Sequence, residues 1–134
     1  MAIQRSKATM KTKRILVVDD EPSITRTMKL NLERSGAYSV CTENHADRAL
    51  ETARRFQPNL IFLDVMMPEI DGGHLAAQIG SDRSFKGVPV IFLTAIVSEK
   101  ETTANGKMIA GHFFLAKPAS LAALTRCIEE FTEV

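Results

Sequence analysis

Short apolar runs recur along the chain, each four to six residues long and rich in β-branched or aromatic side chains. Runs of this length and composition are typical of strands buried on both faces of a parallel sheet. Between them, apolar residues recur every three or four positions, which is the spacing of one face of a helix. The pattern predicts five strands, at residues 15–18, 38–42, 60–63, 88–93 and 113–116.

Helices are predicted in the intervals between these strands and after the last one. Pro22 suits the first turn of the first helix, and Gly36 is a typical residue for its end. The fourth interval also predicts a helix, although the turn-forming pair Asn105-Gly106 falls inside it. The five helices are expected at residues 22–36, 46–56, from the loop 66–73 to residue 79, at 98–109 and at 121–131.

Strands that alternate with helices imply a parallel sheet with helices on both faces, joined by right-handed crossovers. In such α/β folds, ligands bind beyond the carboxyl ends of the strands. That rule selects polar residues directly after four of the five predicted strands, whereas the second strand contributes only Glu43. The selected residues are Asp19, Asp20, Asp64, Thr94 and Lys117.

Three carboxylates at one edge of a sheet would repel each other, by about 4 kcal/mol for two charges about 4 Å apart at an effective dielectric near 20. A cation would offset this repulsion, and oxygen ligands without a nearby His or Cys favour Mg²⁺. Lys117 adds a fixed positive charge and Thr94 a hydroxyl donor. These groups are the ones that phosphoryl transfer requires, with Asp64 as the nucleophile because Asp19 and Asp20 are better placed as metal ligands.

Each of these residues also has an ordinary structural interpretation when it is taken alone. Asp19 and Asp20 can cap the following helix, Thr94 can stabilise a turn, and Lys117 before proline can lie in a solvated turn. Their joint placement at the ends of the first, third, fourth and fifth strands favours a shared site. No suitably spaced partner makes His45, His74 or His112 a metal ligand, and we interpret all three as structural.

Four segments resemble the signature segments of bacterial response-regulator receiver domains, in that family's order and spacing. They are Ile15-Leu-Val-Val-Asp-Asp-Glu-Pro22, Leu63-Asp-Val-Met-Met-Pro-Glu-Ile-Asp-Gly72, Leu93-Thr-Ala95 and Ala116-Lys-Pro118. The resemblance implies a receiver domain at residues 13–134. It implies a flavodoxin-like, doubly wound, five-stranded parallel sheet of order 2-1-3-4-5, flanked by five helices.

The resemblance also implies a role for each matching residue in a two-component signalling system. Asp64 would accept a phosphoryl group from a histidine kinase or a phosphotransfer protein, and Lys117 would pair with that group. Asp20 would bind Mg²⁺ directly and Asp19 mostly through water, with the backbone carbonyl of Met66 as a further ligand. The protein would then be a phosphoacceptor that assists its own phosphorylation and dephosphorylation, and not an enzyme acting on another substrate.

The same resemblance implies a conformational switch. Thr94 would move toward the phosphoryl group while Phe114, three residues before Lys117, rotates inward; a local shift would give Phe113 this role instead. The face formed by the fourth helix, the fifth strand and the fifth helix would carry the output. A downstream effector protein or a missing output domain would respond to it, and a phosphorylation-dependent homodimer is a further expectation.

Composition and charge limit the remaining possibilities. Hydrophobic residues make up 45% and charged residues 25% of the 134 residues, as in ordinary globular domains. No apolar run or leader predicts a membrane span or a secretory signal, so we expect a cytoplasmic location, with Cys41 and Cys127 as buried free thiols. Residues 1–12 predict a flexible basic tail. Without the five cations that precede Asp19, the net charge of +1 becomes −4, and no direct binding of nucleic acid is expected.

Two other functions fit the same residues. One is a Mg²⁺-dependent phosphohydrolase that works through a phospho-aspartate, but the short loops offer neither a substrate pocket nor a cap. The other is a receiver-like binding module that is never phosphorylated, which the complete set of site residues disfavours. Met66 and Ile96, each two positions past a site residue, are apolar, and we hypothesise that they restrict water access and slow dephosphorylation.

Overall fold

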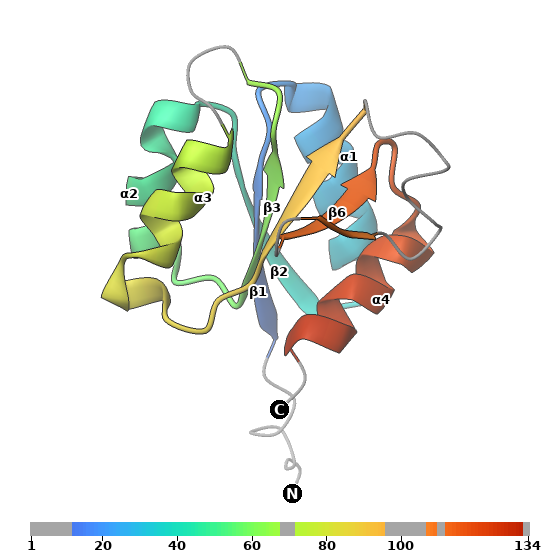
Figure 1. Cartoon of the computed structure of the whole chain (residues 1–134). Coiled ribbons are helices and arrows are strands. Elements are labelled where there is room, and N and C mark those ends of the chain that lie inside the picture. The colour runs from blue at the N-terminus through green and yellow to red at the C-terminus, as the bar shows by residue number, and fades with distance from the viewer. Residues whose placement is uncertain (1–11, 68–71, 96–106, 110–111, 133–134) are drawn as a thin grey trace, which may run out of the picture.

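The computed structural model describes residues 12–67, 72–95, 107–109 and 112–132. Its centre is a sheet in which five parallel strands follow the predicted order 2-1-3-4-5 (Figure 1). A short additional strand, β5, pairs antiparallel with the last of them at the edge. In spatial order the strands are β2 (Tyr38–Glu43), β1 (Lys13–Val18), β3 (Leu60–Asp64), β4 (Val90–Thr94), β6 (His112–Ala116) and β5 (Lys107–Ile109).

Helices cover both faces of this sheet, as the alternating pattern predicts. Figure 1 shows α2 and α3 on one face and α1 and α4 on the other. Short 3₁₀ turns precede α2, at Ala46–Arg48, and follow α3, at Arg83–Phe85. The α-helices among the described residues are α1 (Pro22–Glu33), α2 (Ala49–Phe56), α3 (Gly72–Gly80) and α4 (Leu121–Thr132).

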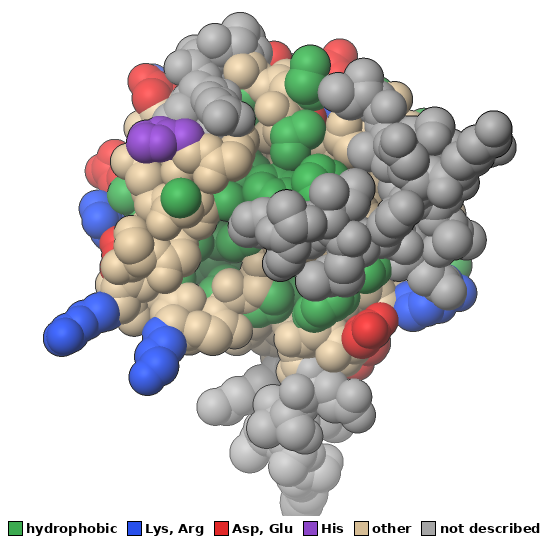
Figure 2. Space-filling model, viewed as in Figure 1, with side chains coloured by type: hydrophobic (Ala, Val, Ile, Leu, Met, Phe, Trp, Pro, Cys, Tyr) green, Lys and Arg blue, Asp and Glu red, His purple; other side chains and the backbone are tan. Residues whose placement is uncertain are grey.

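The core consists of two apolar clusters, one on each face of the sheet. Alternate residues of a strand point to opposite faces, so Ile15 and Val17 join the cluster under α1 and α4. Leu16 and Val18 join the cluster under α2 and α3. Burial on both faces explains why the strands are nearly continuous apolar runs. Further apolar side chains gather over the strands between α3 and α4, on the face seen in Figure 2.

The prediction of a helix over residues 98–109 is wrong at its C-terminal end. Lys107–Ile109 forms strand β5, in which Ile109 pairs with His112 and Lys107 with Phe114. The edge of β6 offers backbone hydrogen-bonding groups to a segment that follows the turn-forming pair Asn105-Gly106, and strand pairing replaces the last helical turn. The rest of this predicted helix, residues 98–106, lies outside the described residues. So do residues 1–11 of the predicted tail.

At the opposite edge of the sheet, helix α1 covers the middle of strand β2. Glu33 Oε2 accepts a hydrogen bond from the Val40 backbone N–H at 2.8 Å, and Lys29 Nζ donates to the Val40 carbonyl at 2.6 Å. Lys29 and Glu33 also form an ion pair at 3.1 Å, one helical turn apart. Two side chains of α1 therefore satisfy the backbone groups of an edge-strand residue.

The amino ends of the strands are joined to α4 and to the turn before β3. Glu129 of α4 accepts hydrogen bonds from the Tyr38 hydroxyl at 2.7 Å and from Lys13 Nζ at 2.9 Å. The backbone N–H of Arg14 donates to Asn59 Oδ1 at 2.7 Å. These contacts lie at the end of the sheet opposite the predicted site. The polar contacts of the site can be compared with them.

Candidate functional site

Three carboxylates meet at the carboxyl ends of β1 and β3. These strands are neighbours in register, with Val18 beside Leu63, so Asp19 and Asp20 follow β1 where Asp64 ends β3. One ligand atom from each of the three acids lies within 4.8 Å of the others. Asp19 is fully buried and Asp64 is 2% exposed. The structure thus brings together the three acids that the strand-end rule selects.

Lys117 reaches this cluster from the residue after β6. Its Nζ donates to Asp19 Oδ2 at 2.9 Å and lies 3.4 Å from Asp64 Oδ1. The backbone N–H of Lys117 donates to the carbonyl of Thr94 at 2.9 Å, which fixes where the lysine leaves the sheet. Only 14% of its side chain is exposed, so one largely buried ammonium group contacts two buried carboxylates.

Burial and mutual repulsion set the ionisation of these groups. Burial raises the pKa of Asp64 and the charge of Asp19 raises it further, while the Met66 N–H and Lys117 act in the opposite direction. Burial would lower the pKa of Lys117, but the hydrogen bond to Asp19 and the charges of Asp19 and Asp64 raise it overall. Lys117 therefore stays protonated at neutral pH, and a further cation beside Asp64 would be favoured.

Of the other residues considered from the sequence, Met66 and Thr94 lie beside Asp64 and Glu43 lies apart. The Met66 backbone N–H donates to Asp64 Oδ1 at 3.1 Å, while the Met66 side chain is 58% exposed. Thr94 ends β4, the strand next to β3, and is buried. Glu43 lies outside the acidic cluster, because Thr52 Oγ1 donates to its Oε1 at 2.6 Å and the His45 N–H to its Oε2 at 3.0 Å.

The two aromatic candidates of the fifth parallel strand lie on opposite faces. Phe113 packs against Phe131 with ring centroids 4.9 Å apart and borders the cluster under α1 and α4. Phe114 packs against Phe92 with centroids 5.0 Å apart and borders the cluster under α2 and α3. Both rings are half-buried. Phe113 is thus packed against the last helix, whereas Phe114 lies on the opposite face of the sheet.

Helix α3 starts against the backbone of the loop that follows β3. A Cβ atom at Gly72 would lie 2.8 Å from the Val65 Cα and 3.2 Å from the Asp64 carbonyl oxygen. Contacts this short with backbone atoms would displace the loop, so only glycine fits. The close approach places the first turn of α3 directly behind Asp64.

Sequence analysis missed Asn44, which contacts the acidic loop from the residue after β2. Its Nδ2 donates to the Asp19 backbone carbonyl at 2.7 Å and to Thr25 Oγ1 at 3.0 Å. The strand-end rule could have found it, because Asn44 is polar and follows the second strand at the same edge of the sheet.

The chemistry of the cluster fits a hard divalent cation such as Mg²⁺. Its donors are all carboxylate oxygens, and within the described ranges no His or Cys belongs to it. His45 and His74 are exposed and lie outside it. Asp19, Asp20 and Asp64 are the residues that would hold the ion.

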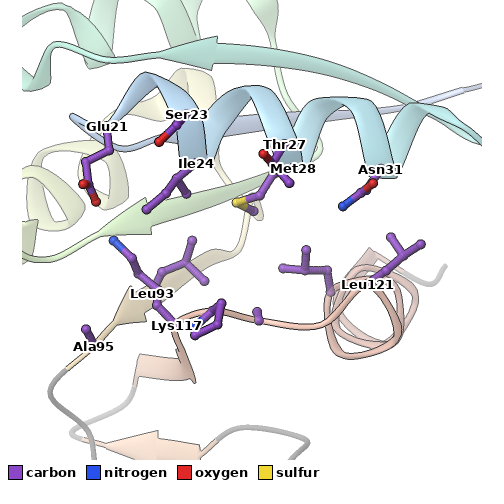
Figure 3. A pocket seen from close by; sticks show the side chains of 13 residues that line it. Glu21, Ser23, Ile24, Thr27, Met28, Asn31, Leu93, Ala95, Lys117 and Leu121 are labelled. Carbon is purple, nitrogen blue, oxygen red and sulfur yellow. The ribbon is translucent and has the colours of Figure 1, made fainter.

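A groove of about 530 Å³ runs beside the site between α1 and α4 (Figure 3). Ile24, Met28, Leu121 and Leu124 supply apolar lining, and Lys117 lies among the lining residues at the end toward the acidic cluster. A molecule lying in this groove would reach the lysine from the side of α1.

Comparisons with known proteins agree with this arrangement. A model of the response regulator receiver domain family matches residues 15–129. Protein PilG of Pseudomonas aeruginosa is 34% identical over 128 residues, covering 90% of this chain and 91% of that protein. The alkaline phosphatase synthesis transcriptional regulatory protein PhoP of Bacillus subtilis is 39% identical over 108 residues. That match covers 81% of this chain but only 43% of that protein.

Solved structures show the same fold. A putative response regulator from Chloroflexus aurantiacus has a TM-score of 0.77 and 26% identity, covering 92% of this chain and 100% of that one. The chemotaxis response regulator CheY4 of Vibrio cholerae has a TM-score of 0.74 and 25% identity, covering 90% and 99%. No helix among the described residues is long and apolar enough to cross a bilayer.

Proposed function

The chain belongs to the response regulator receiver domain family of two-component and chemotaxis systems, and on this premise we propose that Asp64 accepts a phosphoryl group with the help of Mg²⁺. The donor is a histidine kinase or a phosphotransfer protein. One observation carries the proposal. Asp64 is buried with Lys117 Nζ 3.4 Å from its Oδ1, and Asp19 and Asp20 are close enough to share a cation with it.

In the proposed reaction, a carboxylate oxygen of Asp64 attacks the phosphorus of a phosphohistidine. The phosphorus–nitrogen bond breaks, its electron pair stays on the histidine nitrogen, and Asp64 becomes an acyl phosphate. Bound Mg²⁺ supplies charge neutralisation for the phosphoryl oxygens. Lys117, held in place by Asp19, is positioned to exchange its contact with Asp64 Oδ1 for one with a phosphoryl oxygen. The groove beside Lys117 gives the donor an approach.

Phosphorylation is proposed to act through the strand and helix that follow Thr94. Thr94 moves toward the phosphoryl group and the Phe114 side chain rotates inward. These movements change the output surface, which is formed by β6, α4 and the chain between Thr94 and β6. An effector protein or an output domain responds to that change, and a homodimer forms through the same surface. Such signalling takes place in the cytoplasm, where the kinase presents its phosphohistidine.

The first experiment incubates the protein with Mg²⁺ and acetyl phosphate and reads its intact mass. We expect a gain of one phosphoryl group, about 80 Da, that disappears in Asp64→Ala. Glu43→Gln is the matched control, because Glu43 ends a neighbouring strand at the same edge but lies outside the cluster. If wild type gains no mass although it binds Mg²⁺, the protein is a binding module or depends on its own kinase. Turnover of a phosphomonoester would instead indicate a phosphohydrolase.

We further propose that Met66 slows dephosphorylation. It lies two residues past Asp64 and is 58% exposed, so its apolar side chain can stand beside the acyl phosphate and offers an attacking water no hydrogen bond. The partner position in this hypothesis, Ile96, lies outside the described residues. We expect the phosphorylated form to last longer than seconds in Mg²⁺ buffer and Met66→Asn to decay faster. Equal decay rates would contradict the hypothesis.

A further inference from the structure

We infer that Asn44 is a positioning residue for the metal-binding loop, and the inference rests on the proposed Mg²⁺-dependent phosphorylation. Asn44 lies directly after β2, and its side chain contacts none of the three carboxylate groups. Its partners are the backbone carbonyl of Asp19 and the hydroxyl of Thr25. Its role is to hold the backbone that carries Asp19 and Asp20.

The first partner of Asn44 is the peptide group that joins the two acids. The β1–β2 ladder ends at the hydrogen bond from the Asp19 N–H to the Glu43 carbonyl, at 3.1 Å. Beyond this point the chain leaves the sheet, and the Asp19 carbonyl has no strand beside it to pair with. Asn44 Nδ2 takes that place at 2.7 Å. Because this carbonyl belongs to the Asp19–Asp20 peptide plane, the bond fixes the direction in which Asp20 leaves the backbone.

The second partner of Asn44 is the first turn of α1. The same Nδ2 donates to Thr25 Oγ1 at 3.0 Å, and that hydroxyl in turn donates to the Pro22 carbonyl at 3.2 Å. Thr25 is 2% exposed. An amide NH₂ carries two hydrogens, and these two acceptors account for both. Asn44 thus ties both ends of the loop between Asp19 and Thr25, with Asp20 between the two ties.

The geometry identifies the Asn44 amide as the donor that this place requires. A backbone carbonyl accepts only, so the nitrogen and not the oxygen of Asn44 must face Asp19. An aspartate at this position would turn a carboxylate toward the carbonyl and add a fourth negative charge near the cluster. The Asp19 side chain is held separately, by the Glu21 N–H at 3.0 Å and by Lys117 at 2.9 Å. Only Asn44 holds its carbonyl, among the contacts of the described residues.

The test measures Mg²⁺ affinity directly, by following backbone amide signals in an NMR titration of the unphosphorylated protein. Outer partners of metal ligands contribute roughly 10–100-fold to metal affinity, and we expect Asn44→Ala to weaken Mg²⁺ binding about tenfold. Phosphorylation by acetyl phosphate should then need more Mg²⁺ but reach the wild-type rate at saturation. In metal-free protein, the Glu21 and Thr25 amides should exchange with solvent faster.

Asn59→Ala is the matched control. Asn59 also uses its side chain to hold a β1 backbone group, the Arg14 N–H, but at the other end of the strand. It should leave Mg²⁺ affinity unchanged even if it lowers stability. Thr25→Val completes a double-mutant cycle. If Asn44 acts as a tie to Thr25, the two substitutions together should weaken Mg²⁺ binding by less than the product of their separate effects.

Equal Mg²⁺ affinities for wild type and Asn44→Ala would overturn the inference while leaving the proposed function intact. Equal losses in Asn44→Ala and Asn59→Ala would also overturn it, because they would indicate a general loss of stability. Failure of the proposed function looks different, since wild type itself would then take up no phosphoryl group.

Discussion

Two lysine–carboxylate pairs with the same 2.9 Å separation lie at opposite ends of the sheet. Lys117 and Asp19, at the carboxyl ends of the strands, have side chains that are 14% and 0% exposed. Lys13 and Glu129, at the amino ends, are 30% and 58% exposed. Water screens the second pair far more than the first, so the same N–O distance corresponds to a weaker interaction in the exposed pair. Lys117 of the buried pair also contacts Asp64. Two carboxylates then share one ammonium group, and the excess negative charge can attract a cation.

The largest effect is expected from removing each lysine in turn. Lys117→Met leaves Asp19 and Asp64 buried without a cation, which should lower the free energy of unfolding by about 3 kcal/mol and suppress phosphorylation. Lys13→Met should cost less than about 1 kcal/mol and leave phosphorylation unchanged. Denaturant unfolding and intact-mass spectrometry measure the two quantities. Equal losses of stability would show that burial does not distinguish the two ends of the sheet.

A second pair of substitutions tests the two ends of α3. Gly72→Ala places a methyl group against the backbone behind Asp64, so we expect a loss of about 1–3 kcal/mol and slower phosphorylation. At Gly80, at the other end of the helix, an added Cβ atom would meet nothing within 4 Å. Gly80→Ala should be neutral or raise stability by up to about 1 kcal/mol. Thermal unfolding of the two variants gives the comparison, and a neutral Gly72→Ala would refute the steric argument.

A third prediction concerns Mg²⁺ as a ligand of the folded state. At ten times its dissociation constant, Mg²⁺ should raise the free energy of unfolding by about 1.4 kcal/mol. Asp20→Asn should abolish most of this increase, because Asp20 is part of the acidic cluster. Glu129→Gln, at the amino ends of the strands, should retain it. Chelation by EDTA during calorimetry is the control. An increase that persists in Asp20→Asn would place the ion elsewhere.

The smallest expected effect is a difference in pH dependence. The pKa of Asp64 is raised from its ordinary value of 3.8, first by burial. At pH values above this raised pKa, the ionised Asp64 carboxylate lowers the free energy of unfolding. This destabilisation disappears as the pH falls through the raised pKa and the carboxylate becomes protonated. Asp64→Asn should then stabilise the metal-free protein at neutral pH, and the advantage should shrink on acidification. Unfolding free energies measured from neutral to acidic pH give this difference.

Glu129 should show the opposite sign. The Tyr38 hydroxyl and Lys13 lower its pKa below the ordinary value of 4.5. Its contribution to stability is complete above 4.5 and is lost as the pH falls through the lowered pKa. Glu129→Gln should therefore destabilise the protein slightly at neutral pH, with the difference vanishing in acid. Curves of the same sign for Asp64→Asn and Glu129→Gln would contradict the contrast between the two ends.

The strand-end rule predicted the site from sequence because it depends on topology alone. Parallel strands place their carboxyl ends at one edge, so Asp19, Asp64 and Lys117 had to converge once the alternating pattern was recognised. The two helical layers followed from the same pattern, and the order of the five parallel strands followed from the family resemblance. These features depend on many residues, and no single contact decides them.

Other features depend on tertiary contacts that no local pattern records. Strand β5 exists because the edge of β6 was available for pairing, which residues 107–109 do not reveal by themselves. The faces of Phe113 and Phe114 depend on strand register, since a shift of one residue exchanges them. The register that pairs Phe92 with Phe114 decides this. The contacts of Asn44 with the Asp19 carbonyl and the Thr25 hydroxyl depend on the path of the loop after β1, which the sequence around Asn44 does not specify.

The cover over strand β2 affects how copies of this protein meet at high concentration. An exposed edge strand presents free N–H and C=O groups on which another chain can build a continuous sheet. At Val40 both groups are already bonded, to Glu33 and Lys29. A strand from another chain would have to displace the charged side chains of Glu33 and Lys29 before it could form hydrogen bonds with the Val40 backbone. Pairing of another chain with β2 at Val40 is therefore disfavoured.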